Sequence, residues 1–211
     1  MHKRLFAFML LMVLSFALFG CAPAAPSAAD LKPPVVKLAR VEAVGVFPIP
    51  WPGWPVQPPT PTPQFNVVPR FPITLSFVFD LENPNDAPMT LEQMKFNVEL
   101  EAKPDAPGEY FSLASQNVYD RQTIAGKATN SLRVNVVVDS GVVPGTLTVA
   151  YGQRMAEKKL NASTLVNYWW DKVGDVSSAN PAYGIKVTGG SAEFSSGAAR
   201  QMATFETKWP K

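Results

Sequence analysis

The sequence predicts a mainly β protein: an antiparallel β-sandwich of the immunoglobulin or fibronectin-III type, with about seven strands and one helix near residues 162–173. Two segments, residues 71–82 and 94–101, alternate between apolar and polar side chains, which is the pattern of a strand with one buried face. A later segment instead carries apolar residues at helical spacing. A single cysteine cannot form an internal disulfide, so stability must come from an apolar core, and we expect one domain over residues 33–211.

The first residues of the chain predict export. A basic start at residues 2–4 precedes a predominantly apolar run over residues 5–19. This run is shorter than the ~20 residues that a transmembrane helix needs and is typical of a signal peptide. Cys21, the only cysteine, follows Leu18-Phe19-Gly20 and resembles the modified residue of a bacterial lipoprotein signal. We therefore interpret residues 1–20 as a lipoprotein signal peptide.

Lipidation of Cys21 predicts a membrane anchor. Two or three acyl chains, palmitate among them, anchor stably where a single chain is marginal. Residues 21–32 are small and Pro-containing, which predicts a flexible tether. Ala22 after the cysteine favours sorting to the outer membrane. We expect the protein to lie in the cell envelope as a monomer, with the membrane as its partner through the lipid anchor. The alternative is an ordinary signal peptide that is cut at Ala22 or beyond, with loss of Cys21.

Charge and composition narrow the function. The full chain has 19 Lys+Arg and 17 Asp+Glu, but Lys3 and Arg4 leave with the signal peptide, so the mature chain is formally neutral. No basic run remains to predict nucleic-acid binding. His2, the only histidine, is also removed, which excludes His-based catalysis and most transition-metal sites from the mature domain. We predict no metal and no cofactor.

The remaining candidates for catalysis are carboxylates. Glu99 and Glu101 are two apart on a predicted strand and therefore share a face, which we expect to be exposed to solvent. A carboxylate needs burial or a charged neighbour to shift its pKa usefully. The sequence therefore predicts a protein without catalytic residues.

The first strand is predicted at Val35 to Val46, with an irregularity near Arg40. Ten prolines follow between residues 47 and 72, and they favour an extended, semi-rigid insertion. This insertion carries three aromatic residues, Trp51, Trp54 and Phe65. They either pack against an edge of the sandwich or present a surface to a partner.

The later elements follow from the same patterns. After the two alternating segments, strands are predicted at residues 118–124, 132–138, 146–151, 185–187, 192–194 and 203–209, with turns at residues 189–190 and 195–197.

The predicted helix is amphipathic, with Asn161 or Ser163 as its cap and Gly174 at its end. Its apolar positions are Leu165, Val166, Trp169, Trp170 and Val173. Trp169 and Trp170 suit either the core or a ligand pocket.

A turn between the two alternating segments carries a family resemblance. Asn83-Pro84-Asn85 follows the strand at residues 77–82, and Pro84 holds Asn83 extended. Each asparagine is expected to bond its own backbone two residues on. Met89-Thr90-Leu91 and the strand at residues 94–101 follow. In this order the chain resembles the late embryogenesis abundant type 2 family, also called the water stress and hypersensitive response (WHy) domain, over roughly residues 33–209.

The resemblance implies a β-sandwich with a late helix, no shared catalytic residues, and an association with desiccation and other stress. It also implies an exported lipoprotein of the bacterial version of the family. Asn83, Pro84 and Asn85 carry over as a structural turn. The chain departs from the family in two long insertions, residues 47–72 and 101–117.

These observations predict a non-enzymatic envelope lipoprotein, a stress-related module that interacts with or protects other envelope components. The alternative is a binding protein for a small apolar ligand or lipid. That alternative would use the aromatic loop with Trp51 and Trp54 and the helix with Trp169 and Trp170.

Overall fold

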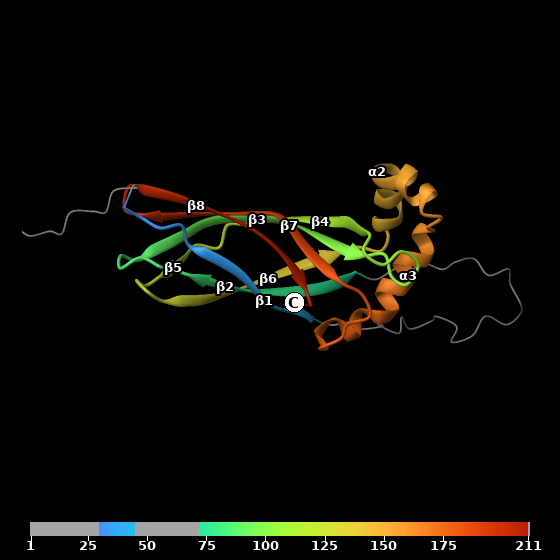
Figure 1. Cartoon of the computed structure of the whole chain (residues 1–211), viewed down its shortest axis with the longest axis horizontal. Helices are drawn as coiled ribbons and strands as arrows, with labels where there is room; N and C mark the ends of the chain where they lie inside the picture. The colour runs from blue at the N-terminus through green and yellow to red at the C-terminus, as the bar shows by residue number, and fades with distance from the viewer. Residues whose placement is uncertain (1–29, 45–71, 211) are drawn as a thin grey trace, which may run out of the picture.

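The computed structural model describes residues 30–44 and 72–210, and in these residues it is a sandwich of two antiparallel sheets (Figure 1). The predicted mainly β fold is therefore confirmed. The signal peptide, Cys21 and most of the tether lie outside the described residues, as do residues 45–71 with Trp51, Trp54 and Phe65. The statements made about them from the sequence stay predictions.

The smaller sheet has three strands in the order β1-β2-β6. They are β1 (Val35–Ala43), β2 (Ile73–Glu82) and β6 (Thr129–Val138). In the middle of the sheet Phe77 pairs with Val41 on one side and Val134 on the other. The predicted irregularity near Arg40 is a register shift in β1 between Leu38 and Arg40.

The larger sheet has five strands, with β4-β3-β7-β8 in order and β5 also paired to β3. They are β3 (Met89–Glu101), β4 (Tyr110–Val118), β5 (Gln122–Ile124), β7 (Ile185–Ser196) and β8 (Ala199–Trp209). The two sheets enclose an apolar core in which Phe79 contacts Phe96 and Phe205 edge to face. Full burial of each such side chain stabilises the fold by about 1.5–3 kcal/mol before entropy is counted.

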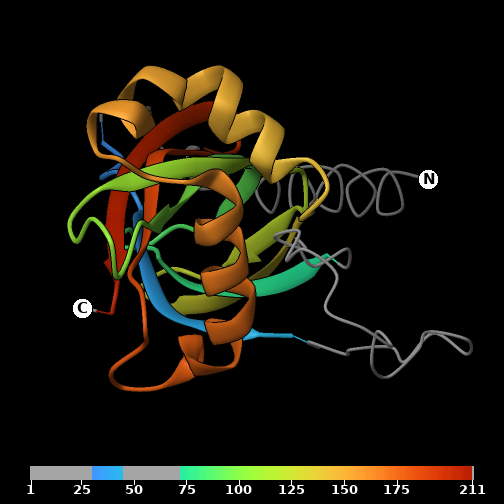
Figure 2. The same cartoon turned by 90° about the vertical axis from the view of Figure 1, so that its right-hand side faces the viewer.

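Two helices lie at one end of the sandwich, where the sequence predicts one (Figures 1 and 2). The predicted helix is α3 (Ala162–Lys172), and the Asn161 side chain caps it by accepting a hydrogen bond from Thr164 N at 3.0 Å. A 3₁₀ turn, η1 (Val173–Ser177), continues from it. Figure 2 shows α3 crossing the end of the two sheets.

The second helix corrects a predicted strand. Residues 146–151 belong to α2 (Val143–Glu157). Their β-branched residues favour a strand, but Pro144 in the first turn starts a helix. Val143, Leu147 and Met155 then fall on one face and become buried. Tertiary packing therefore outweighs local propensity here.

Several strand boundaries also differ from the prediction, and β3, β6 and β8 each begin earlier than expected. Residues 110–117, expected within an insertion, belong to β4, and residues 119–121 interrupt the strand predicted at 118–124. The turn predicted at residues 189–190 lies inside β7, where the pairing with β8 shifts between Val187 and Gly190. Glycine permits that bulge without ending the strand, because Gly189 adopts a positive φ of 58°.

Candidate functional site at the asparagine turn

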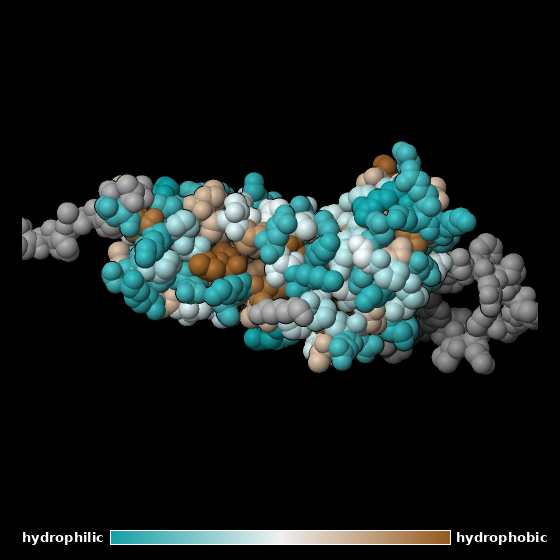
Figure 3. All heavy atoms as spheres, viewed as in Figure 1, coloured by the Kyte–Doolittle hydropathy of each residue, from teal (hydrophilic) through white to brown (hydrophobic). Residues whose placement is uncertain are grey.

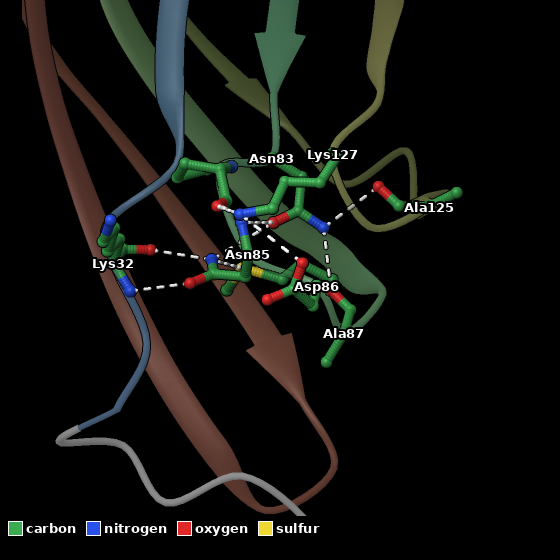
Figure 4. A network of polar contacts seen from close by, with 9 residues as sticks. Lys32, Asn83, Asn85, Asp86, Ala87, Ala125 and Lys127 are labelled. Carbon is green, nitrogen blue, oxygen red and sulfur yellow. Dashed lines mark hydrogen bonds and ion pairs between the residues drawn. The ribbon is translucent and has the colours of Figure 1, made fainter.

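The end of the sandwich opposite the helices, which we call the asparagine pole, is formed by the turns at residues 83–87 and 125–128 and by the incoming chain at Lys32 (Figure 4). β2 ends at Glu82, and the Asn83 side chain continues its hydrogen bonding. Its Nδ2 donates to the carbonyl oxygens of Ala87 at 2.9 Å, Ala125 at 3.1 Å and Ile124 at 3.3 Å. One buried amide thus joins two turns that are about 40 residues apart in the sequence.

The acceptor side of the Asn83 amide fixes the next residue of the motif. Asn83 Oδ1 accepts hydrogen bonds from Asn85 N at 3.0 Å and from Asn85 Nδ2 at 3.1 Å. The expected bond of Asn83 to the backbone two residues on is therefore present. Every donor and acceptor position of this side chain has a protein partner.

Asn85 differs from the prediction, because its side chain binds a distant segment of the chain. Lys32 N donates to Asn85 Oδ1 at 2.8 Å, and Asn85 Nδ2 donates to the Lys32 carbonyl at 2.9 Å. The side-chain amide thus pairs with the backbone of Lys32 as a neighbouring strand would. We call this pair of bonds the Lys32 clamp. It holds the chain just before β1 begins at Val35.

Gly126 brings the second turn of this pole into contact with the first. A Cβ atom on Gly126 would lie 1.9 Å from the carbonyl oxygen of Asp86, so only glycine allows this approach. Lys127 N then donates to the Asn85 carbonyl at 2.8 Å, and Lys127 Nζ donates to the Pro84 carbonyl at 2.7 Å. The sequence gives a signal for this contact only in the short Ala125-Gly126-Lys127 turn.

The opposite end, which we call the helical pole, is organised by Glu101. Glu101 is 4 % exposed, so the expectation of a solvent-facing carboxylate was wrong. Its carboxylate accepts hydrogen bonds from Gly108 N and Gly184 N, each at 2.8 Å, and Lys103 Nζ lies 3.3 Å away. Burial raises the pKa of Glu101, but these donors outweigh burial and hold the pKa below its usual value.

The predicted tryptophan pair belongs to the core of this pole. Trp169 is fully buried and donates its Nε1–H to the Glu101 carbonyl at 2.7 Å, while Trp170 is almost fully buried. Tyr183 donates its hydroxyl to the Trp169 carbonyl at 3.2 Å, and burial raises the pKa of that hydroxyl. Of the two predicted roles, core and ligand pocket, the structure therefore favours the core for Trp169 and Trp170.

The outer face of β2 is less exposed than strict alternation predicts. Ser76 and Val78 are buried on this face beneath charged side chains. Arg133 donates to Ser76 Oγ at 2.8 Å and also pairs with Glu42. Hydrogen bonds from Arg133 and Arg40 lower the pKa of Glu42 to about 2.

Other surfaces supply less specific information. The face in Figure 3 is mainly hydrophilic, with an apolar patch near β1. Within residues 30–44 and 72–210, no group of three or more His, Cys, Asp or Glu side chains is placed to hold a metal ion. In the same residues no helix is long and apolar enough to cross a bilayer.

Comparison with known proteins does not assign the chain to a family. No family model and no curated protein matches the chain. Among solved structures it is similar to a protein from Archaeoglobus fulgidus, with 10% identity, a TM-score of 0.36, and coverage of 83% of this chain and 98% of that one. It is also similar to the Arabidopsis thaliana protein AT1g01470, with 8% identity, a TM-score of 0.41, and coverage of 90% and 85%. Similarities this distant do not bear on function.

Proposed function

We propose that this chain is a lipid-anchored protein of the cell envelope, similar to late embryogenesis abundant type 2 (WHy) domains, that interacts with or protects other envelope components under stress. The observation that carries the proposal is the Lys32 clamp. The family resemblance rests on the Asn-Pro-Asn motif. Asn85 of this motif binds the backbone of Lys32, which is where the predicted tether from Cys21 ends.

The clamp determines which pole of the domain the tether reaches. Ten peptide units separate Cys21 from Leu31, so the asparagine pole can lie at most about 35 Å from the lipid anchor. β2 alone adds about 33 Å between the two poles. The helical pole is therefore the end of the domain that is farther from the tether. Val44 and Thr74, which flank the Pro-rich segment, lie at this pole, where Val44 N donates to Thr74 O at 2.9 Å.

The helical pole also carries apolar side chains that suit contact with an envelope protein. Val149 on α2 is 88% exposed. Three further valines are exposed: Val142 just before α2, Val137 in β6 and Val44 just after β1. Contiguous apolar patches mark interaction sites, so these exposed valines are the side chains that we propose for such a contact. The alternative of an apolar-ligand pocket is less favoured, because Trp169 and Trp170 are part of the core.

The anchor is tested first. We expect the wild-type chain, expressed in a diderm bacterium, to incorporate an alkyne-labelled palmitate and to partition into the detergent phase of Triton X-114, with outer-membrane fractions. Cys21→Ser should abolish both, and a matched Ser27→Ala change in the tether should leave both unchanged. Label-free wild-type protein in the aqueous phase would contradict the anchor.

The stress role is tested separately. A deletion strain should lose viability after drying or osmotic shock, and the wild-type gene should restore it. Restoration by the Cys21→Ser variant would show that the domain acts without its anchor. Normal survival of the deletion strain would contradict the stress role and leave the anchor result intact.

A further inference from the structure

A trough crosses the outer face of the five-stranded sheet at the level of Lys95. One hollow of about 150 Å³ lies between Asn117 and Tyr119 at one end and Met202 at the other, with Lys95 and Glu193 between them. A second hollow of about 520 Å³ shares Lys95 with the first and extends toward Thr204 and Glu206. The two hollows are contiguous and span β4, β3, β7 and β8.

Strand register explains why these side chains meet. Lys95 pairs with Asn117 of β4 and with Ser191 of β7, which makes one row across the sheet. Glu193 pairs with Gln93 and with Met202, which makes the neighbouring row. All of them point outward, because the adjacent positions on their strands fill the core.

Two register shifts make this part of the sheet hollow. The pairing of β3 with β7 shifts between Leu91 and Gln93 and again between Lys95 and Asn97, so bulges lie on both sides of the trough. Bulges bend a strand and change the direction of its side chains. Gly190 forms part of the floor, and a Cβ there would lie 2.4 Å from the Phe205 carbonyl oxygen. The shape is therefore built into the backbone.

The polar groups of the trough are arranged to bind an uncharged ligand with many hydroxyls. The side chains of Lys95, Asn117 and Tyr119 form no hydrogen bond or ion pair with the described residues. Glu193 is held in place by Gln93 Nε2 at 2.9 Å and by Arg200 at 3.6 Å. The trough thus offers an amide, an ammonium, a carboxylate and hydroxyls together, which can both donate to and accept from the same ligand.

Other ligand classes fit these groups less well. Among residues 30–44 and 72–210, Lys95 is the one cation that lines the two hollows, and Glu193 and Glu206 would repel phosphate or nucleic acid. The apolar side chains that line the hollows, Met94, Met202, Tyr119 and Phe205, are interspersed with charged ones, whose charges a lipid chain would leave without polar partners. An added peptide strand would lie along a sheet edge and parallel to the strands, whereas the trough runs across them.

We propose that this trough binds a short, uncharged saccharide. The Tyr119 side chain is 72 % exposed at one end and offers a flat ring on which the C–H face of a sugar can stack. Asn117 and Lys95 then bind hydroxyl or acetamido groups of the next sugar ring. The trough spans three inter-strand spacings, about 14 Å, which accommodates a short chain of linked rings. The proposal concerns the folded domain and does not depend on lipidation at Cys21.

The test is isothermal titration calorimetry on the full chain in detergent micelles. The probes are an N-acetylglucosamine tetramer, maltotetraose and inorganic phosphate, which separate acetamido sugars, plain glucans and anions. Tyr119→Ala and Asn117→Ala should each weaken saccharide binding about tenfold, since each removes one principal contact. The matched control is Asn135→Ala on the exposed face of β6, which should bind like the wild type.

Both trough residues are exposed, so the variants should keep the wild-type melting temperature, and a loss of binding will not reflect unfolding. Binding of either tetrasaccharide that is lost in both trough variants and kept in Asn135→Ala supports the proposal. Three results overturn it: no heat with either saccharide, binding that the trough variants leave unchanged, or binding of phosphate alone.

Discussion

The two poles of the sandwich each satisfy buried backbone groups at strand ends, and they do so with opposite chemistry. At the asparagine pole the unpaired groups are mainly carbonyls, and the Asn83 amide donates to three of them. At the helical pole the unpaired groups are the N–H groups of Gly108 and Gly184, and the Glu101 carboxylate accepts from both. The kind of side chain therefore matches the kind of backbone group that it must satisfy.

The difference has a consequence for pH dependence. An amide does not titrate, so the asparagine pole should hold equally well at all moderate pH values. A carboxylate whose pKa is lowered by folding contributes stability above its unfolded pKa and loses it as the pH falls through the folded pKa. Exchanging amide and acid at each pole therefore tests the comparison directly.

The largest effect is expected for Asn83→Asp. The substitution keeps the shape but places an acceptor-only group against three carbonyl oxygens, so we expect the free energy of unfolding at pH 7 to fall by about 3–5 kcal/mol. Urea unfolding followed by tryptophan fluorescence measures it. Burial raises the pKa of the new acid, and the protonated form can donate, so the deficit should shrink as the pH falls toward 4.

The matched control for this exchange is Asn135→Asp on the exposed face of β6, which should change stability by no more than about 0.5 kcal/mol. A deficit of that small size in Asn83→Asp, or one that grows on acidification, would contradict the role assigned to the buried amide.

A glycine at each pole gives the next comparison. Gly126→Ala forces Cβ to 1.9 Å from the backbone oxygen of Asp86, which cannot move without opening the turn. Gly184→Ala meets the Tyr110 hydroxyl at 2.5 Å and the Glu101 carboxylate at 2.9 Å, which are side-chain ends. We expect Gly126→Ala to destabilise by about 2–3 kcal/mol and Gly184→Ala by less. Thermal unfolding ranks the two, and Gly145→Ala, with open space around it, should not destabilise.

Removal of the Lys32 clamp should have a smaller and more local effect. Asn85→Ala deletes both bonds to Lys32, one to Asn83 and one to the Met89 sulfur, for an expected loss of about 2 kcal/mol. The backbone amide of Lys32 should then exchange with solvent much faster than in the wild type, while amides in β7 at the centre of the large sheet change less. Equal acceleration in both places would mean that the clamp is simply part of the global fold.

The sequence predicts the sandwich because its signals are local. Alternation over β2 places Ile73, Leu75, Phe77, Phe79 and Leu81 in the core, and all five are fully buried. The helix at Ala162–Lys172 is likewise predicted from its cap and its apolar spacing. Each of these signals lies within a few residues of the feature that it specifies.

What the sequence does not predict depends on distant contacts. The Asn-Pro-Asn turn can be read from the motif, but its partner Lys32 is 53 residues away. Glu101 follows the polar face of its strand, and only the approach of Gly184 and the loop at Gly108 buries it. The segment at residues 146–151 has strand propensity and becomes helical because its neighbours offer Leu147 a site in the core.

The smallest effect is expected at the helical pole, from Glu101→Gln. Glutamine can accept from one of the two N–H groups but turns a donor toward the other, so we expect a loss of about 1–2 kcal/mol at pH 7. In the wild type this contribution is complete above the unfolded pKa of 4.5 and disappears as Glu101 becomes protonated at lower pH. The stability difference between the two proteins should therefore narrow as the pH falls below about 4.5.

Other carboxylates with lowered pKa values, such as Glu42 and Glu109, titrate in both proteins and cancel from this difference. Glu99→Gln is the matched control, because Glu99 lies on the same face of β3 and accepts one hydrogen bond, from the Thr188 hydroxyl at 2.8 Å. Its stability difference from the wild type at pH 7 should be smaller, because only one hydrogen bond is affected. A stability difference between Glu101→Gln and the wild type that stays constant from pH 7 to pH 3 would show that the carboxylate charge does not stabilise this pole. The expected contrast in pH dependence between the two poles would then be absent.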